Sequence, residues 1–246
     1  MKIIYSRHVN EIKNLTEDQK NVLYTKQQEG CPDQTWPSDE RCSPDPKIVI
    51  IGVSPGNSPE GTNKEAAEKS CQDTNKGLRG FFYRDTRNYW NKVRYLAREL
   101  TAIPEHDSLL IVSHFNLGIN SSGKASIESV EKNMIQWISR LLNKVIKPDL
   151  VIFFGLKGIL TNPKISDLWN EGEGLKIDWR LPNAKIAFPN NGRNYYYSEW
   201  SATNALGHKM RLVIWPNHPS RPPFSSNMKS WERSVMEYTN HYNRMA

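Results

Sequence analysis

The sequence is poor in cysteine and has no long apolar run. Its three cysteines, Cys31, Cys42 and Cys71, are too few for a disulfide framework, and none stands in a Cys-x-x-Cys pair. A four-cysteine zinc or iron–sulfur site is therefore excluded. No apolar run approaches membrane-spanning length, and the first residues lack the apolar core of a signal peptide. We expect a soluble, monomeric protein of a reducing compartment, cytoplasmic and nucleoid-associated if bacterial, with no membrane partner, metal or cofactor.

Charge of one sign is in moderate excess. The 246 residues carry a formal net charge of +7, with a pI near 9.2. This balance suits a polyanionic partner such as nucleic acid, but many basic proteins bind none, so charge alone shifts the expectation only slightly. The length allows one α/β domain or two small ones.

The clearest structural signal is the stretch from Lys47 to Val53. Its uninterrupted β-branched aliphatic residues predict a strand buried on both faces, as in a parallel sheet covered by helices. The strand breaks into Gly52-Val53-Ser54-Pro55-Gly56, a tight loop at its carboxyl end. Ligands of open α/β sheets bind at that edge. We therefore expect other functional residues of the chain to lie close to this loop.

Strand and helix patterns alternate along the chain and predict right-handed crossovers. We expect an α/β fold, a three-layer α/β/α domain over 47–246 with a central, mainly parallel four-stranded sheet, preceded by an N-terminal helix and loop extension over 1–46. The main strands are expected at 47–53, 109–112, 150–154 and 210–215, and the helices at 15–28, 86–100, from a cap at Ser126 to 145, and 227–242. Possible further strands lie at 184–188 and 194–200, the latter an amphipathic strand pairing with 210–215 or, as the alternative, an aromatic run that stacks on nucleotides.

Two familiar motifs are present only in part. Gly52 to Gly56 has the letters of the hydrolase nucleophile elbow, G-x-S-x-G, but the residue after the serine is Pro55, which has no N–H for an oxyanion hole. The segment from Gly56 to Lys64 resembles a phosphate-binding loop, but its lysine falls two positions late. Both assignments are rejected.

A second polar loop, His218-Pro219-Ser220, follows the last strand of the sheet. Together with Gly52-Val53-Ser54-Pro55 after the first strand, it resembles the uracil-DNA glycosylase superfamily, which has a G-x-x-P loop and an H-P-S loop in these places. Phe81, Phe82 and Asn88-Tyr89-Trp90 are loosely similar to the family's base-stacking stretch and aromatic helix, and 113–116 to its base-reading strand end. The resemblance covers about 47–240.

The resemblance implies a monofunctional DNA glycosylase, with DNA, expected to be double-stranded, as partner. Such an enzyme rotates a base out of the duplex into a site and hydrolyses the N-glycosidic bond, which leaves an abasic site. His218 would hydrogen-bond the carbonyl oxygen of the departing base. Phe81 or Phe82 would stack on that base, although core packing explains these two phenylalanines equally well.

The remaining implied roles concern base reading and DNA contact. Asn116, or Ser113 in a shifted register, would read the polar edge of the base, and the loop after the first strand would bind and place it through Gly52, Val53, Pro55 and Gly56. Ser220, Arg221 and Phe224 would contact DNA, with Arg221 and Phe224 as a wedge in the gap left by the base. A solvated basic loop is the competing interpretation.

Two departures from the family pattern bear on the chemistry. Ser54 occupies the position where efficient uracil-removing members have an acid, so water must be placed by Asn57, by the backbone, or by an acid such as Asp85 or Glu60. Gly56 occupies the position of an aromatic wall that excludes 5-substituted pyrimidines. We therefore expect a weak or specialised catalyst that admits such pyrimidines, in repair or in defence against modified DNA. A catalytically inactive nucleic-acid-binding relative and a nucleoside- or nucleotide-processing enzyme remain as alternatives.

Overall fold

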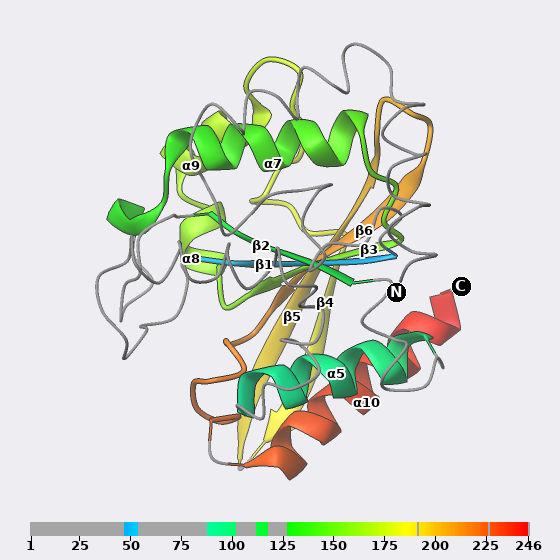
Figure 1. The fold of residues 1–246 in the computed structure, drawn as a ribbon. Helices are drawn as coiled ribbons and strands as arrows, with labels where there is room; N and C mark the ends of the chain where they lie inside the picture. Colours follow the sequence, from blue (N-terminus) through cyan, green and yellow to red (C-terminus); the bar gives the residue numbers. More distant parts are fainter. Residues whose placement is uncertain are drawn as a thin grey trace, which may run out of the picture.

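The computed structural model describes residues 47–53, 88–101, 112–117, 127–190, 192–225 and 227–245. These residues form an α/β fold around one mixed six-stranded sheet with the order β2-β1-β3-β6-β5-β4 (Figure 1). The predicted extension over 1–46, including its helix at 15–28, lies outside the described residues.

Four parallel strands make up one side of the sheet. They are β1 (Ile48–Gly52), β2 (Val112–Asn116), β3 (Leu150–Phe154) and β6 (Lys209–Trp215). Strand β1 pairs with β2 on one side and with β3 on the other, and β3 pairs with β6. Both β1 and β3 are buried along their whole length, which confirms strands covered on both faces.

Strand β2 departs from its predicted position. The segment 113–116 was expected to follow a strand at 109–112, but it is part of β2 and pairs residue by residue with β1 from Val49 to Gly52. Pairing with a buried neighbour extends the strand through polar residues, because strand formation depends on cross-strand context more than on local propensity. Residues 109–111 lie outside the described residues.

The sheet is larger than the expected four strands. Strand β5 (Arg193–Thr203) pairs antiparallel with β6, and β4 (Ala184–Asn190) pairs antiparallel with β5. The pairing of 194–200 with 210–215 is thereby confirmed. Short connections between β4, β5 and β6 favour hairpins, whereas a parallel pair needs a long crossover. The two hairpins account for the mixed sheet.

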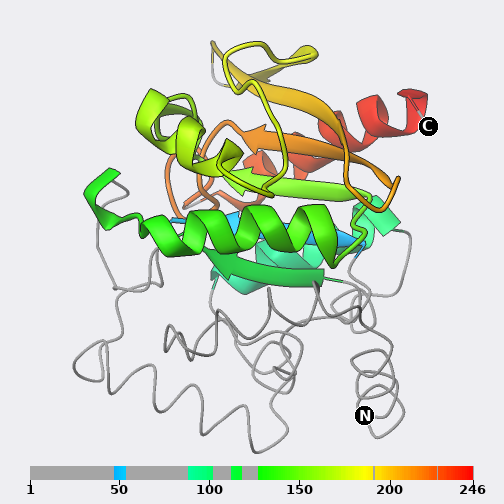
Figure 2. The same ribbon diagram turned by 90° about the horizontal axis from the view of Figure 1, so that it is seen from above.

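Helices lie on both faces of the sheet (Figure 1). Helices α7 (Lys132–Lys144), α8 (Lys157–Leu160) and α9 (Pro163–Asn170) lie on one face, and α5 (Asn88–Thr101) and α10 (Met228–Met245) on the other. Seen from above, α7 lies in front of β1 and runs roughly along it (Figure 2). The expected cap at Ser126 is wrong for α7, because a short 3-10 turn, Ile127–Ser129, precedes it and Glu131 is its N-cap residue.

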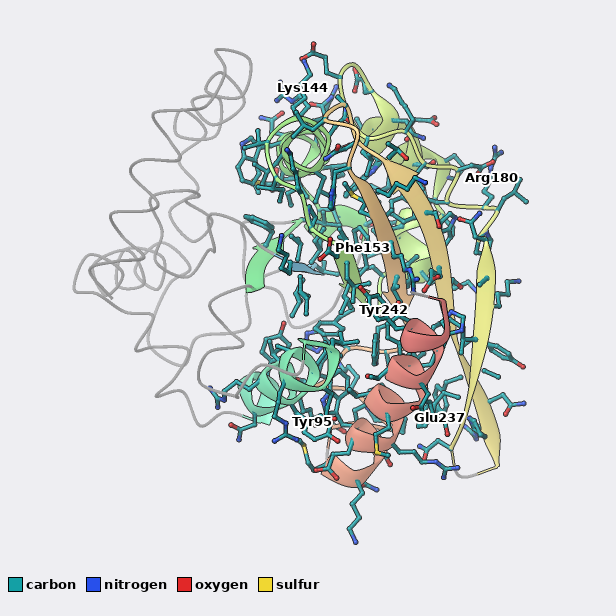
Figure 3. The ribbon with its side chains drawn as sticks, turned by 90° about the vertical axis from the view of Figure 1, so that its right-hand side faces the viewer. Tyr95, Lys144, Phe153, Arg180, Glu237 and Tyr242 are labelled. Atoms are coloured by element: carbon teal, nitrogen blue, oxygen red, sulfur yellow. The ribbon has the colours of Figure 1, made fainter. Side chains whose placement is uncertain are left out.

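Alternating side chains divide the interior into two cores. Val49 and Ile51 of β1 pack under α7, while Ile48 and Ile50 pack toward α5 and α10. Phe153 lies in the middle layer, between α7 with Lys144 and the helices that carry Tyr95 and Tyr242 (Figure 3). Between these two cores, the parallel pairing of β1, β2, β3 and β6 places their carboxyl ends at one edge of the sheet.

Candidate functional site

The carboxyl ends of the four parallel strands lie along one edge of the sheet. Gly52 ends β1 and is paired with Asn116, the last residue of β2. At β3 and β6 the strand ends are also adjacent, since Phe154 pairs with Trp215. The loops that follow Gly52 and Trp215 therefore start from the same edge, with only β3 between them.

His218 lies in the loop after β6, against two aromatic rings. Its imidazole stacks on Tyr89 at the beginning of α5, with a centroid distance of 5.1 Å and an interplanar angle of 7°. The ring edge of Phe154 supports it from the end of β3, at 6.1 Å and 83°. Three elements distant in sequence thus hold the histidine at the carboxyl edge.

A close backbone approach joins β3 to this loop. Gly155 has a φ of +67°, and a Cβ atom built there would lie 2.9 Å from the backbone nitrogen of His218. Its own N–H donates to the Trp215 carbonyl over 3.2 Å. A side chain at this position would both strain the backbone and displace the histidine loop. Gly155 therefore contributes to the placement of His218.

The protonation state of His218 is determined by its surroundings. The Ser220 N–H donates to Nδ1 over 3.1 Å, so the neutral ring carries its proton on Nε2. Burial, followed by the positive charges of Arg221 and Lys92, lowers the pKa of His218 from 6.5 to about 4. The imidazole is consequently neutral near pH 7. None of the described residues bonds Nε2, so this N–H has no acceptor among them.

The structure describes part of the predicted site. His218, Ser220 and Arg221 are together in the loop after β6, with Ser220 and Arg221 exposed. Gly52 and Asn116 end neighbouring strands at the same edge. Other predicted positions lie outside the described residues, namely Ser54, Pro55, Gly56, Asn57, Glu60, Phe81, Phe82 and Asp85.

Two predicted contacts need correction. Phe224 is fully buried, stacks on Phe188 and meets the edge of Trp231, so it cannot be a DNA wedge without leaving the core. Apolar burial explains its position, since an exposed phenylalanine would forgo that free energy. Val53 is 7% exposed and its side chain packs with the core beneath α7, so only its backbone remains for a base.

Sequence reasoning missed two residues of the site. Tyr89 was counted among the apolar positions of its helix and as part of a loosely matching aromatic stretch, but its contact with His218 was not foreseen. Lys92 was not singled out, although a lysine three residues after Tyr89 and four before Leu96 lies within the apolar stripe of the helix. A charged residue within an apolar stripe is unusual, and this feature of the sequence could have pointed to Lys92.

The comparisons with known proteins give no independent assignment: no family, no curated protein and no solved structure matches the chain. Within the described ranges, no group of three or more His, Cys, Asp and Glu residues could hold a metal ion. Over the same ranges, no helix is long and apolar enough to cross a membrane.

Proposed function

We propose that this protein is a monofunctional DNA glycosylase that extrudes a base from DNA and cleaves its N-glycosidic bond. The observation that carries the proposal is His218: a neutral imidazole at the carboxyl edge of the sheet, with Nδ1 occupied and Nε2–H available. The fold we propose for the catalytic unit is the three-layer α/β/α arrangement of the uracil-DNA glycosylase superfamily, centred on the four parallel strands, with the β4–β5 hairpin as an addition.

The chemistry requires a donor for the departing base. Water adds to the sugar carbon as the bond to the base nitrogen breaks, and the electron pair of that bond leaves with the base. The negative charge then spreads to a carbonyl oxygen of the base. A fixed N–H at Nε2 of His218 would stabilise this oxygen, and a donor that is already oriented needs no reorganisation during the reaction. The water proton passes to solvent or to the base.

A neutral histidine suits this role better than a charged one at the same place. Arg221 and Lys92 already make the surroundings of the ring positive, and both disfavour a second proton on it. The same positive surroundings favour an anionic leaving group and nearby phosphates. Exposed Ser220 and Arg221 in this loop are the described residues that we assign to DNA contact.

The substrate is inferred from the first loop of the sequence. Gly56 replaces the aromatic wall of uracil-specific relatives, and we propose that a pyrimidine with a 5-substituent is accepted. Ser54 cannot act as a general base near neutral pH, so we assign water placement to Asn57, with Asp85 as the candidate acid. A modest rate follows, in repair of damaged bases or in defence against modified DNA.

The test is base release from duplexes that carry uracil, mismatched thymine or 5-modified cytosines. Mass spectrometry identifies the free base, and alkali-sensitive strand breaks report abasic sites. We expect release by the wild type and by His208→Ala, a matched histidine control whose ring bonds the Pro148 carbonyl before β3. His218→Ala should reduce the rate by about 10²–10³-fold, as for loss of one oxyanion donor.

Three results would redirect the proposal. Equal rates for wild type and His218→Ala would remove the histidine from the mechanism. Tight, salt-sensitive DNA binding without base release would identify a non-catalytic binder. Ser54 in place of an acid is what such an inactive relative would have. Release confined to free nucleosides would identify a nucleoside-processing enzyme on the same scaffold.

A further inference from the structure

Lys92 is a fully buried lysine on the side of α5 that faces the sheet and α10. It is 0% exposed, although an ammonium group loses much of its hydration free energy on burial. Desolvation accordingly lowers the pKa of Lys92 from its ordinary value of 10.5. An aliphatic side chain would fill the position at lower cost, so the charge needs a specific reason.

The ammonium of Lys92 bonds two backbone carbonyls of the loop that carries His218. Its Nζ donates to the carbonyl of Pro219 over 2.9 Å and to the carbonyl of Phe224. The backbone carbonyl of Lys92 in turn accepts from Nε1 of Trp231 in α10 over 2.9 Å. One residue therefore joins α5, the His218 loop and α10.

The loop does not depend on Lys92 for all of its bonds. The Arg221 N–H donates to the carbonyl of His218 over 2.9 Å, and Asn217 Nδ2 donates to the carbonyl of Pro222 over 2.8 Å. These bonds make the local turn, but they connect only residues of the loop itself. Lys92 supplies the connection to α5, whose Tyr89 stacks on the imidazole.

We propose that Lys92 is a positioning residue for His218: its ammonium ties the loop to α5 at the carbonyls of Pro219 and Phe224 and thereby sets the orientation and charge state of the imidazole. The charged and titratable groups that face the ring from the described elements are Lys92 and Tyr89 of α5 and Arg221 of the loop. A role in base excision rests on the proposed function, whereas the effect on the imidazole does not.

Nuclear magnetic resonance of the full chain with ¹⁵N-labelled histidine tests this directly. The imidazole nitrogens of His218 are assigned by their absence in H218Q and titrated in wild type, K92M, K92R and K147M. Lys147 is an exposed lysine shortly before β3, at the opposite edge of the sheet, so K147M is the matched loss of one charge.

In K92M the imidazole pKa should rise from about 4 toward 6.5 without reaching it, because burial and Arg221 remain, and the single Nε2–H tautomer should be lost. K92R keeps the charge and should stay near wild type, as should K147M. A K92M imidazole indistinguishable from wild type, or a K92R imidazole displaced as far as that of K92M, overturns the proposal.

Should K92M fail to fold, the wild type supplies the same information. Titrating Lys92 itself, observed at its ¹⁵Nζ, should move the Ser220 amide and His218 Nδ1 resonances with the same midpoint, and unchanged resonances would overturn the proposal. Base release is measured separately on the same variants. If the wild type releases no base while the imidazole responds as expected, the proposed function fails and the positioning role stands.

Discussion

The half-buried, neutral imidazole of His218 should make folding stability depend on pH. Its pKa is about 4 in the folded protein, against 6.5 as the ordinary value expected for the unfolded chain. Between these two pH values the unfolded chain binds a proton at this position that the folded protein does not. The free energy of unfolding therefore rises with pH across this window. The contribution of His218 to it is fully present above pH 6.5 and is lost as the pH falls toward 4.

The size of the effect follows from the shift. Each pKa unit corresponds to about 1.4 kcal/mol, so the displacement from 6.5 to about 4 amounts to at most about 3–4 kcal/mol. Part of the ring reaches solvent, which makes this figure an upper limit. Even half of it is a large share of the stability of a typical domain, about 5–15 kcal/mol.

Urea denaturation between pH 4 and pH 7.5 would measure it, in wild type and in two variants. His218→Gln removes the titration, and His218→Phe removes it while keeping a ring against Tyr89 and Phe154. Subtracting the free energy of unfolding of each variant from that of the wild type at each pH removes the contribution of the carboxylates, which titrate in all three proteins. We expect the difference to grow with pH up to about 6.5 and then level off. Parallel curves for all three proteins would refute the claim that the fold keeps this histidine neutral.

Three further outcomes test the packing around the site. Phe224→Ala should lower the free energy of unfolding by about 3–5 kcal/mol, because Phe224 is a core residue. The exposed control Lys229→Ala should change it by less than about 0.5 kcal/mol. Equally small losses for both variants in denaturant melts would show that Phe224 is not a core residue. Gly155→Ala should cost about 1–2 kcal/mol from its left-handed backbone alone and more from contact with the histidine loop, and unchanged thermal stability would contradict the close approach. Tyr89→Leu should raise the imidazole pKa of His218 by admitting water, whereas Tyr89→Phe should preserve it; magnetic resonance titration that shows no difference between the two would contradict the stacking.

The limits of sequence reasoning are clearest at the loop after β6. His218 could be singled out because a histidine between a strand and a Pro-Ser pair belongs to a recognisable local pattern. Phe224 follows in the same loop and was assigned with Arg221 to a DNA wedge, because the family it resembles has a wedge in this region. Its burial against Phe188 depends on β4, which lies more than thirty residues earlier in the chain. Nothing local distinguishes an aromatic wedge from an aromatic anchor.

The sequence by itself determined the elements of this protein: the buried strands β1, β3 and β6, the apolar stripes of α5, α7 and α10, and the polar loops at the strand ends. These follow from hydrophobic periodicity, which is written in neighbouring residues. Only the tertiary structure decided the strand order, the antiparallel direction of β4 and β5, and the bonds of Lys92 to carbonyls 127 and 132 residues away. Such contacts depend on which helix and strand surfaces pack together. The hydrophobic pattern shows that an element has an apolar surface, but not which other element will cover it.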